Sequence, residues 1–350
     1  LLVKFHSGDS LALVSSLIFA IMPFNVYYSR VILPEPLIIT VSLAALLSTS
    51  YWAKKPTLLI YTFILLCFSL LLLLKAYMAV FFLPAMVLSY KKPKSAALLA
   101  AVLGLSFLPF ILWYNWAQNF PEGIPYFKWV FNSDGIRFRP AWFYWIFGIR
   151  FGTLMLGVWG VFLFAQGLLQ AIKAKNYFFV SWFAAILVYI TFVATANVRH
   201  DYYQAIATPI VAVFVAIGLL YLWKDSLAGK LLSLLSLFVM MVVSGREIKG
   251  YYQVNHWEIV EAGKASDKLL PQDAKVIAPY NGDTAFLYQI NRPGWPFVTG
   301  TIDELIQKGA THYVSVNFDD LTNQLMIQYQ ILEKTDKYVI IQLSQLEIRN

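Results

Sequence analysis

Residues 57–90 read TLLIYTFILLCFSLLLLLKAYMAVFFLPAMVLSY and contain a single charged side chain, Lys75. Because about 20 apolar residues span a bilayer as a helix, this stretch is long enough to cross a membrane and return, with Lys75 at the turn. The same pattern continues on both sides, which predicts a polytopic α-helical membrane protein. One of its segments, 141–171, is long enough to include an interfacial turn. The nine apolar segments are 11–29, 35–53, 57–74, 76–90, 96–117, 141–171, 177–196, 203–223 and 227–244.

The composition agrees with a membrane protein over most of the chain. The sequence is 59% hydrophobic and 13% charged, with a mean hydropathy of +0.63. A soluble domain carries roughly twice that charged fraction. The bias ends near residue 244, because 13 of the 19 acidic residues follow it. We therefore expect a transmembrane domain over residues 1–244 and a small soluble domain over residues 245–350.

Lysines mark every second gap between the apolar segments. By the positive-inside rule these gaps are cytoplasmic, and nine crossings then place residues 245–350 in the extracytoplasmic space. The chain is thus predicted to be a multi-pass protein of the cell membrane. Its net charge of +8 reflects orientation signals rather than nucleic-acid binding, and the single Cys67 excludes an intramolecular disulfide. The lysines are Lys54, Lys55, Lys91, Lys92, Lys94, Lys173, Lys175, Lys224 and Lys230.

The segment after residue 244 alternates short helices and strands. In TIDELIQKGA, Thr301 is the expected N-cap, Glu304 is at position N3, and a glycine ends the helix. Alternation of this kind predicts a small α/β domain with a mostly parallel sheet. The other expected helices are HWEIVEAGKASDKLL (256–270) and DTAFLYQI (283–290), and the expected strands are AKVIAP (274–279), THYVSV (311–316) and KYVIIQLS (337–344).

Acidic residues and arginines gather on the outer side of this topology. The first 244 residues hold six acids, of which four fall in outward-facing gaps, and all five arginines map to the same side of the membrane. A charge near hydrocarbon costs free energy, so this grouping indicates an active site for an anionic, phosphate-bearing, lipid-linked substrate. The acids are Glu35, Glu122, Asp134 and Asp201, and the arginines are Arg30, Arg137, Arg139, Arg150 and Arg199.

Glu35 stands between Pro34 and Pro36 at the expected start of a helix. The helix dipole favours its ionised form there. A simpler interpretation stays open, in which Glu35 is a capping carboxylate at the interface, paired with Arg30. A pair of Asp201 and Arg199 at the interface is open in the same way.

Five stretches in chain order resemble the dolichyl-phosphate-mannose protein mannosyltransferase-like superfamily of GT-C membrane glycosyltransferases. Its bacterial branch includes the aminoarabinose transferases that act on lipid A. The chain departs from the family where Ala76-Tyr77 replaces a Gly-Pro pair after Lys75. The stretches are VYYSRVILPEPL (26–37), LLLLKAYMAVFFLPAMVL (71–88), IRFRPAWFYWI (136–146), RHDYYQAIATPIVAVFVAIGL (199–219) and FLYQINRPGWP (286–296).

The resemblance implies a GT-C fold and an enzyme that moves a sugar from a polyprenyl-phosphate donor to an extracytoplasmic protein, lipid or glycan. Glu35 matches a catalytic acidic position, although an inverting transfer by Glu35 as the sole base is not expected. The family's principal catalytic aspartate lies in an earlier loop, which we expect to precede this chain as an N-terminal part missing from it. The implied phosphate-binding cations are Arg30, Lys75, Arg137 and Arg199, and the implied cavity residues are Tyr27, Tyr28, His200, Tyr202 and Tyr203.

Asp134 occupies the position of a family histidine that can hold a divalent metal, so the resemblance leaves a metal cofactor open. Two other functions also stay open. A carrier or flippase for lipid-linked sugars would need the same outer cations, but it should show charged or broken helices near the midplane on both sides. A scaffold whose outer domain binds a partner would leave the four outer acids unexplained.

Overall fold

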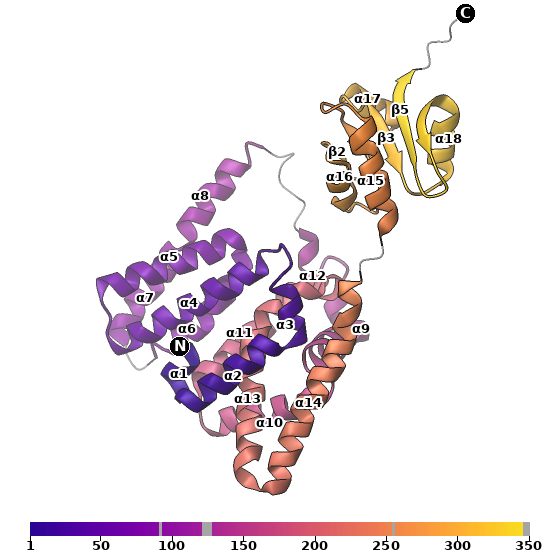
Figure 1. Cartoon of the computed structure of the whole chain (residues 1–350). Coiled ribbons are helices and arrows are strands. Elements are labelled where there is room, and N and C mark those ends of the chain that lie inside the picture. Colours follow the sequence, from indigo (N-terminus) through magenta and orange to yellow (C-terminus); the bar gives the residue numbers. More distant parts are fainter. Residues whose placement is uncertain (91–92, 121–127, 254–255, 346–350) are drawn as a thin grey trace, which may run out of the picture. The chain divides into compact units, whose positions relative to one another are not determined.

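The computed structural model describes residues 1–90, 93–120, 128–253 and 256–345. The chain forms two compact units, Leu1–Tyr252 and Gln253–Asn350 (Figure 1). The first unit is helical, and the second holds the β-sheet. Each unit is described by itself below.

The helical unit is built from short and long apolar helices joined by 3₁₀ turns and one π-helical segment. Its elements are α1 (Leu2–Ser7), α2 (Asp9–Ile21), α3 (Pro23–Tyr28), α4 (Glu35–Lys54), α5 (Leu58–Leu74), η1 (Ala76–Phe81), α6 (Phe82–Val87), α7 (Pro93–Leu105), α8 (Phe107–Ala117), η3 (Lys128–Val130), η4 (Ile136–Phe138), α9 (Pro140–Phe143), η5 (Tyr144–Met155), α10 (Gly160–Lys173), α11 (Tyr177–Phe192), α12 (Ala194–Arg199), η6 (Asp201–Ala207), α13 (Thr208–Asp225), α14 (Leu227–Lys249) and η7 (Gly250–Tyr252).

Each of the nine predicted apolar segments falls on helix, so the helical part of the prediction is confirmed. By length and composition, four helices among the described residues could cross a membrane: Glu35–Lys54, Ser95–Ala117, Asp201–Asp225 and the helix that begins at Leu227. A fifth results if Pro140–Met155 and Gly160–Lys173, bent by 106°, form one crossing. This bend lies inside the segment where a turn was expected.

The remaining apolar helices are shorter than their apolar segments. The segment 11–29 is divided between α2 and α3 at Met22–Pro23, because proline has no N–H with which to continue the helical hydrogen bonds. The segment 76–90 starts as a 3₁₀ helix after Lys75 takes an extended conformation. Apolar length alone therefore overestimated the length of the continuous helices.

Helix α13 is the most buried of the long apolar helices and packs on α2, α10 and α14. Its contact with α10 depends on two glycines that bring the helix backbones together. A Cβ atom on Gly167 would lie 1.8 Å from the Phe214 carbonyl oxygen, and one on Gly218 would lie 2.0 Å from the Leu163 carbonyl oxygen. Any side chain at either position would force the helices apart.

The C-terminal unit is a five-stranded sheet with the order β2-β1-β3-β5-β4. Alternate residues of its strands face two cores: Val276 and Val314 pack towards α15 and α16, whereas Ile277 and Tyr313 pack with the core of α17 and α18. Its elements are α15 (Trp257–Leu269), β1 (Val276–Ile277), α16 (Ala285–Ile290), β2 (Gly294–Trp295), α17 (Ile302–Gln307), β3 (His312–Ser315), α18 (Asp320–Gln328), β4 (Tyr329–Lys334) and β5 (Val339–Gln345).

All six elements expected in the C-terminal unit are present, and the Thr301 hydroxyl accepts the Glu304 N–H at 3.2 Å as its capping pattern predicts. The expectation of a mostly parallel sheet is wrong. Strand β1 is parallel to β2 and β3, but β5 is antiparallel to both β3 and β4. Only a tight turn near Thr335 joins β4 to β5, and a connection this short can join only antiparallel neighbours.

Candidate functional site

Some of the predicted outer residues meet at one segment, residues 195–204, which spans the end of α12 and the start of η6. Side chains of this segment contact residues from the ends of α3 and α5, from the loop before α9, from η5 and from η7. The backbone is extended at His200, so neighbouring side chains point to different elements. Helix ends that are far apart in the sequence thus meet around residues 195–204 of the helical unit.

Glu35 and Lys75 form a buried ion pair in this place. The Lys75 ammonium contacts Glu35 Oε1, and the two side chains are 14% and 2% exposed, respectively. Pro34 and Pro36 hold Glu35 at the first position of α4, and Lys75 follows the last residue of α5. The sequence predicted a carboxylate at a helix start, but with Arg30 as its simplest partner. Its partner is Lys75.

The Lys75 ammonium also faces aromatic rings. Its Nζ lies 4.2 Å from the ring centroid of Tyr203, and the rings of Tyr202 and Tyr77 lie at 5.8 and 5.9 Å. The Tyr189 hydroxyl donates to the Tyr203 carbonyl at 3.2 Å, which fixes the backbone at that residue. The charged pair is thus surrounded by tyrosines, whose rings attract the cation without neutralising it.

Asp201, two residues before Tyr203, has three partners. The hydroxyls of Tyr28 and Tyr251 both donate to its carboxylate, and Arg150 Nη1 lies 3.5 Å from Oδ2. Arg150 is further held by the Val198 carbonyl at 3.1 Å. Arg150, and not Arg199, is therefore the cation that pairs with Asp201, because the extended backbone at His200 points Arg199 elsewhere.

Asp134 is bound to the α12 part of the same segment. Its Oδ1 accepts the Thr195 hydroxyl at 2.7 Å, and its Oδ2 lies 3.6 Å from Arg199 Nη2. The Thr195 hydrogen bond, followed by the Ile136 N–H and Arg199, holds the pKa of Asp134 below its ordinary value. Within the described residues, no three His, Cys, Asp or Glu side chains are grouped as metal ligands. The described residues around Asp134 therefore do not fit a metal site.

The four expected phosphate-binding cations are not gathered into one cluster. Lys75 and Arg199 already have acidic partners, whereas the exposed Arg30 has no hydrogen bond or ion pair to another described side chain. Arg137 is half-buried, and its Nε is buried without a hydrogen-bond partner among the described residues. Glu122 lies outside the described residues.

The expected cavity residues form two aromatic groups. The rings of His200, Tyr202 and Tyr203 are stacked, and Trp129 meets His200 edge-on at 5.8 Å. Burial lowers the pKa of His200 below its ordinary value, so its ring is neutral at neutral pH. The second group surrounds Tyr27, whose ring contacts those of Tyr28, Tyr251 and Tyr252.

The opposite end of α4 carries a different set of groups. His6 Nε2 lies 2.8 Å from Ser50 Oγ, and Lys54 lies 3.8 Å above the Phe5 ring. The 20 residues of α4 separate this end from Glu35 by about 30 Å. The acid-rich and lysine-bearing helix ends are thus at opposite ends of one long apolar helix.

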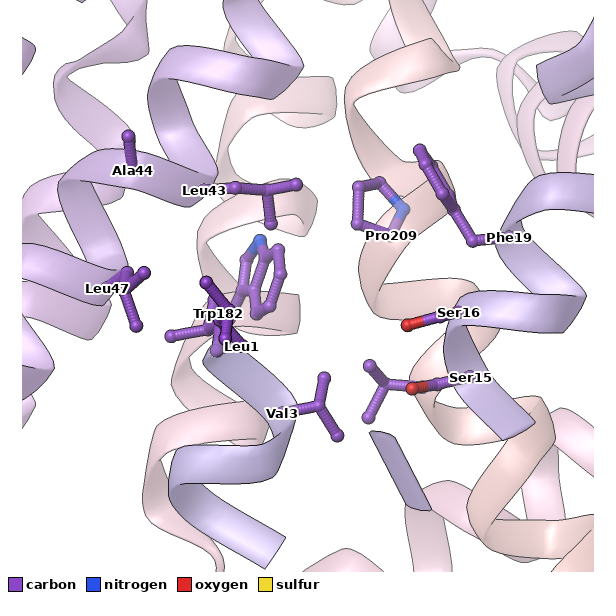
Figure 2. A pocket seen from close by; sticks show the side chains of 12 residues that line it. Leu1, Val3, Ser15, Ser16, Phe19, Leu43, Ala44, Leu47, Trp182 and Pro209 are labelled. Carbon is purple, nitrogen blue, oxygen red and sulfur yellow. The ribbon is translucent and has the colours of Figure 1, made fainter. Parts of the chain in front are cut away.

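An apolar cavity of about 300 Å³ lies between α1, α2, α4, α11 and α13. Leu43 borders one side of it, with Phe19 and Pro209 on the other (Figure 2). A second cavity, of about 200 Å³, shares Phe19 and Leu43 with the first and reaches Tyr28 and Ser29. Since Tyr28 binds Asp201, the apolar space adjoins the polar site.

Sequence reasoning placed Arg150 among the outer arginines but gave it no role, and it missed Tyr77, Tyr189 and Tyr251 as contributors to the site. Arg150 had a usable signal, because it is a lone charge inside the apolar segment 141–171, and such charges mark functional positions. The three tyrosines had none, since only the fold brings them to Lys75 and Asp201. The chain matches no known family model, and a comparison with curated proteins finds no similar sequence.

Proposed function

We propose that the protein is a membrane glycosyltransferase that moves a sugar from a polyprenyl-phosphate donor to an acceptor outside the cytoplasm. The observation that carries this proposal is the buried Glu35–Lys75 pair beside Tyr203, with the Glu35 second oxygen buried and without a hydrogen-bond partner among the described residues. A cation and a carboxylate at one place supply the two charges that this transfer needs.

A membrane location is supported by the surface of the helical unit. Helix α5 exposes Leu58, Leu59 and Leu66 at 84%, 66% and 60%, and large apolar residues of α8 and α14 are exposed as well. Soluble monomers rarely expose contiguous apolar surface on this scale. We place the acid-rich end of α4 and the C-terminal unit outside the cytoplasm, as the lysine pattern predicts.

The proposed chemistry is an exchange of bonds at the anomeric carbon of the donor sugar. The bond from that carbon to the phosphate oxygen breaks, and the oxygen keeps the electron pair. An acceptor oxygen forms the new bond to the anomeric carbon. The proton of that oxygen passes to a carboxylate of the site, and Glu35 takes part in this proton transfer. Lys75 and Arg137 would stabilise the negative charge that grows on the leaving phosphate, since cations in a water-poor site act strongly on such charge.

The two apolar cavities, the second of which reaches Tyr28, agree with a substrate that carries an isoprenoid chain. Their walls are mostly hydrocarbon, and they lie between helices that we place in the membrane. A chain bound there would bring its phosphate to the polar end of α4. The acceptor class, whether protein, lipid or glycan, is left to the experiment.

The test is to incubate the purified protein with radiolabelled polyprenyl-phosphate sugars and membrane extract, and to follow both polyprenyl phosphate and label. We expect release of polyprenyl phosphate together with label on an acceptor, and loss of both in Glu35→Ala. The exposed Glu261→Ala in the C-terminal unit is the control. Transfer that is equally fast in wild type and Glu35→Ala would contradict the proposal.

A carrier for lipid-linked sugars is the second candidate, and the 106° bend between η5 and α10 favours it, because broken helices are typical of transporters. Arg150, the charge on η5, binds Asp201 at the acid-rich end of the unit. The same assay separates the two functions, since a carrier would bind the donor without releasing polyprenyl phosphate.

A further inference from the structure

The Lys75 ammonium is poorly supplied with hydrogen-bond acceptors. It has three N–H donors, and Glu35 Oε1 is the one strong acceptor it contacts among the described side chains. Its other neighbours are the rings of Tyr203, Tyr202 and Tyr77, which attract a cation but replace no carboxylate or phosphate oxygen. The side chain is 14% exposed, so it remains within reach of a ligand.

Glu35 is equally short of partners. Its Oε2 is buried and lacks a hydrogen bond from any described group. The described acids nearby differ, because Asp201 has Tyr28, Tyr251 and Arg150, and Asp134 has Thr195, Arg199 and the Ile136 N–H. Asp201 and Asp134 are held in the fold by several bonds. Among the described residues Glu35 is held by Lys75 alone, so one exchange of partner releases its carboxylate.

We propose that a phosphate ligand takes Lys75 from Glu35, and that the released carboxylate then accepts the proton of the acceptor. The exchange deepens the proposed function and rests on it. A polyprenyl-phosphate sugar is a diester with one negative charge, which equals the charge of Glu35. When the sugar leaves, the phosphate gains a second ionisable oxygen, so Lys75 is drawn to it as the bond breaks. The interaction is strongest in the transition state and the product, where it accelerates the reaction.

If this exchange occurs, the Glu35–Lys75 pair lowers the affinity of the free protein for phosphate. In the free protein, Glu35 competes with phosphate for Lys75, whose one strong hydrogen bond within the described part of the chain is to Glu35. Removal of the Glu35 charge should therefore tighten the binding of a phosphate monoester, although it abolishes proton transfer. A purely structural ion pair predicts the opposite, because its loss would loosen the site and weaken binding.

The experiment measures equilibrium binding of radiolabelled polyprenyl monophosphate to the purified protein and four variants. We expect about tenfold tighter binding for Glu35→Gln and about tenfold weaker binding for Lys75→Gln, as expected for one hydrogen bond to a charged group. The double variant should match Lys75→Gln, because Glu35 acts through Lys75. Glu261→Gln removes a carboxylate from the exposed pair with Lys337 and should bind like wild type.

Unchanged or weaker binding by Glu35→Gln would overturn the exchange. If Glu35→Gln fails to fold, Glu35→Asp must still tighten binding, because its shorter carboxylate loosens the contact with Lys75. The binding pattern is also separable from the proposed function. If Glu35→Gln binds more tightly but the wild-type protein transfers no sugar, the exchange of partners is supported and the transferase function is contradicted.

Discussion

Arg292 in the C-terminal unit and Glu35 in the helical unit are both buried charges, but their hydrogen bonding differs. Arg292 is 5% exposed, and all five of its N–H groups have acceptors: Pro271 O at 2.6 Å, Asp267 Oδ1 at 2.7 Å, Leu270 O at 2.7 Å, Asn291 O at 2.8 Å and Asp267 O at 3.2 Å. Glu35 has one partner, Lys75, and one oxygen without a hydrogen bond, counted over the residues that the structure describes.

The difference separates a structural charge from a candidate functional one. Arg292 ties the C-terminal end of α15 to the residue that follows α16, and nothing is left for a ligand to bind. The geometry around Arg292 explains this arginine as a stabilising residue. A buried polar atom without a partner costs free energy, so its presence at Glu35 needs another explanation, which a ligand supplies.

The largest effect is expected on the stability of the C-terminal unit in Arg292→Met. Methionine fills similar space but donates no hydrogen bond, so the carbonyls of Asp267, Leu270, Pro271 and Asn291 lose a donor, and the cost is about 3 kcal/mol. Limited proteolysis of the whole protein would report the opening of this unit. Lys268→Met, at an exposed position of α15, is the control. Equal resistance of both variants to the protease would contradict a structural role for Arg292.

Glu35→Gln should affect activity far more than folding. Glutamine keeps an acceptor for Lys75, so we expect a loss of about 1–2 kcal/mol in stability. Loss of a carboxylate that accepts a proton should lower the transfer rate about 100-fold or more. The measurements are thermal unfolding in detergent and the polyprenyl phosphate release assay. A large drop in melting temperature that accounts for the loss of activity would show that Glu35 has a structural role, like Arg292.

Arg137 and Arg139 offer a matched pair, two residues apart in one loop. Arg137 has a buried Nε without a described partner, whereas Arg139 is exposed. We expect Arg137→Ala to weaken binding of polyprenyl monophosphate about tenfold, which is the scale of one charge-assisted hydrogen bond, and Arg139→Ala to change it less. Equal losses in the two variants would show a diffuse electrostatic effect instead of a defined contact.

The smallest effect concerns Asp134, which is partly exposed. Its pKa is lowered by the Thr195 hydroxyl, so the stability it contributes is present above its unfolded pKa and is lost as the pH falls through the folded value. An exposed pair of this kind contributes less than about 1 kcal/mol. Asp134→Asn should therefore lower the melting temperature slightly at pH 7, and the difference from wild type should vanish under acid conditions. A difference that persists or grows in acid would contradict this assignment.

Local patterns in the sequence predicted the helices and most of the C-terminal elements. The structure also shows what such patterns miss. Strand β2 is two residues long, and it can pair closely with β1 because Gly294 has no side chain. A Cβ at this position would lie 1.7 Å from the Val276 carbonyl oxygen. Helix α18 had a readable start, since the Asp319 carboxylate accepts the Thr322 N–H at 2.8 Å. Neither α18 nor β4 was among the elements expected from the sequence.

The site could be predicted in its residues but not in its pairings. Charge placement indicated Glu35, Lys75 and Asp201, because a charge beside an apolar segment stands out in any sequence. Lys75 follows Glu35 by 40 positions, and Tyr251 follows Asp201 by 50. No local pattern encodes such contacts, since they depend on how the helices pack.

The most direct test of the central claim is an experimental structure of the protein with bound polyprenyl monophosphate. The account predicts a phosphate oxygen within about 3 Å of Lys75 Nζ, a normal hydrogen-bond distance, and a Glu35 carboxylate that no longer contacts Lys75. A phosphate bound elsewhere, with the Glu35–Lys75 pair intact, would contradict it.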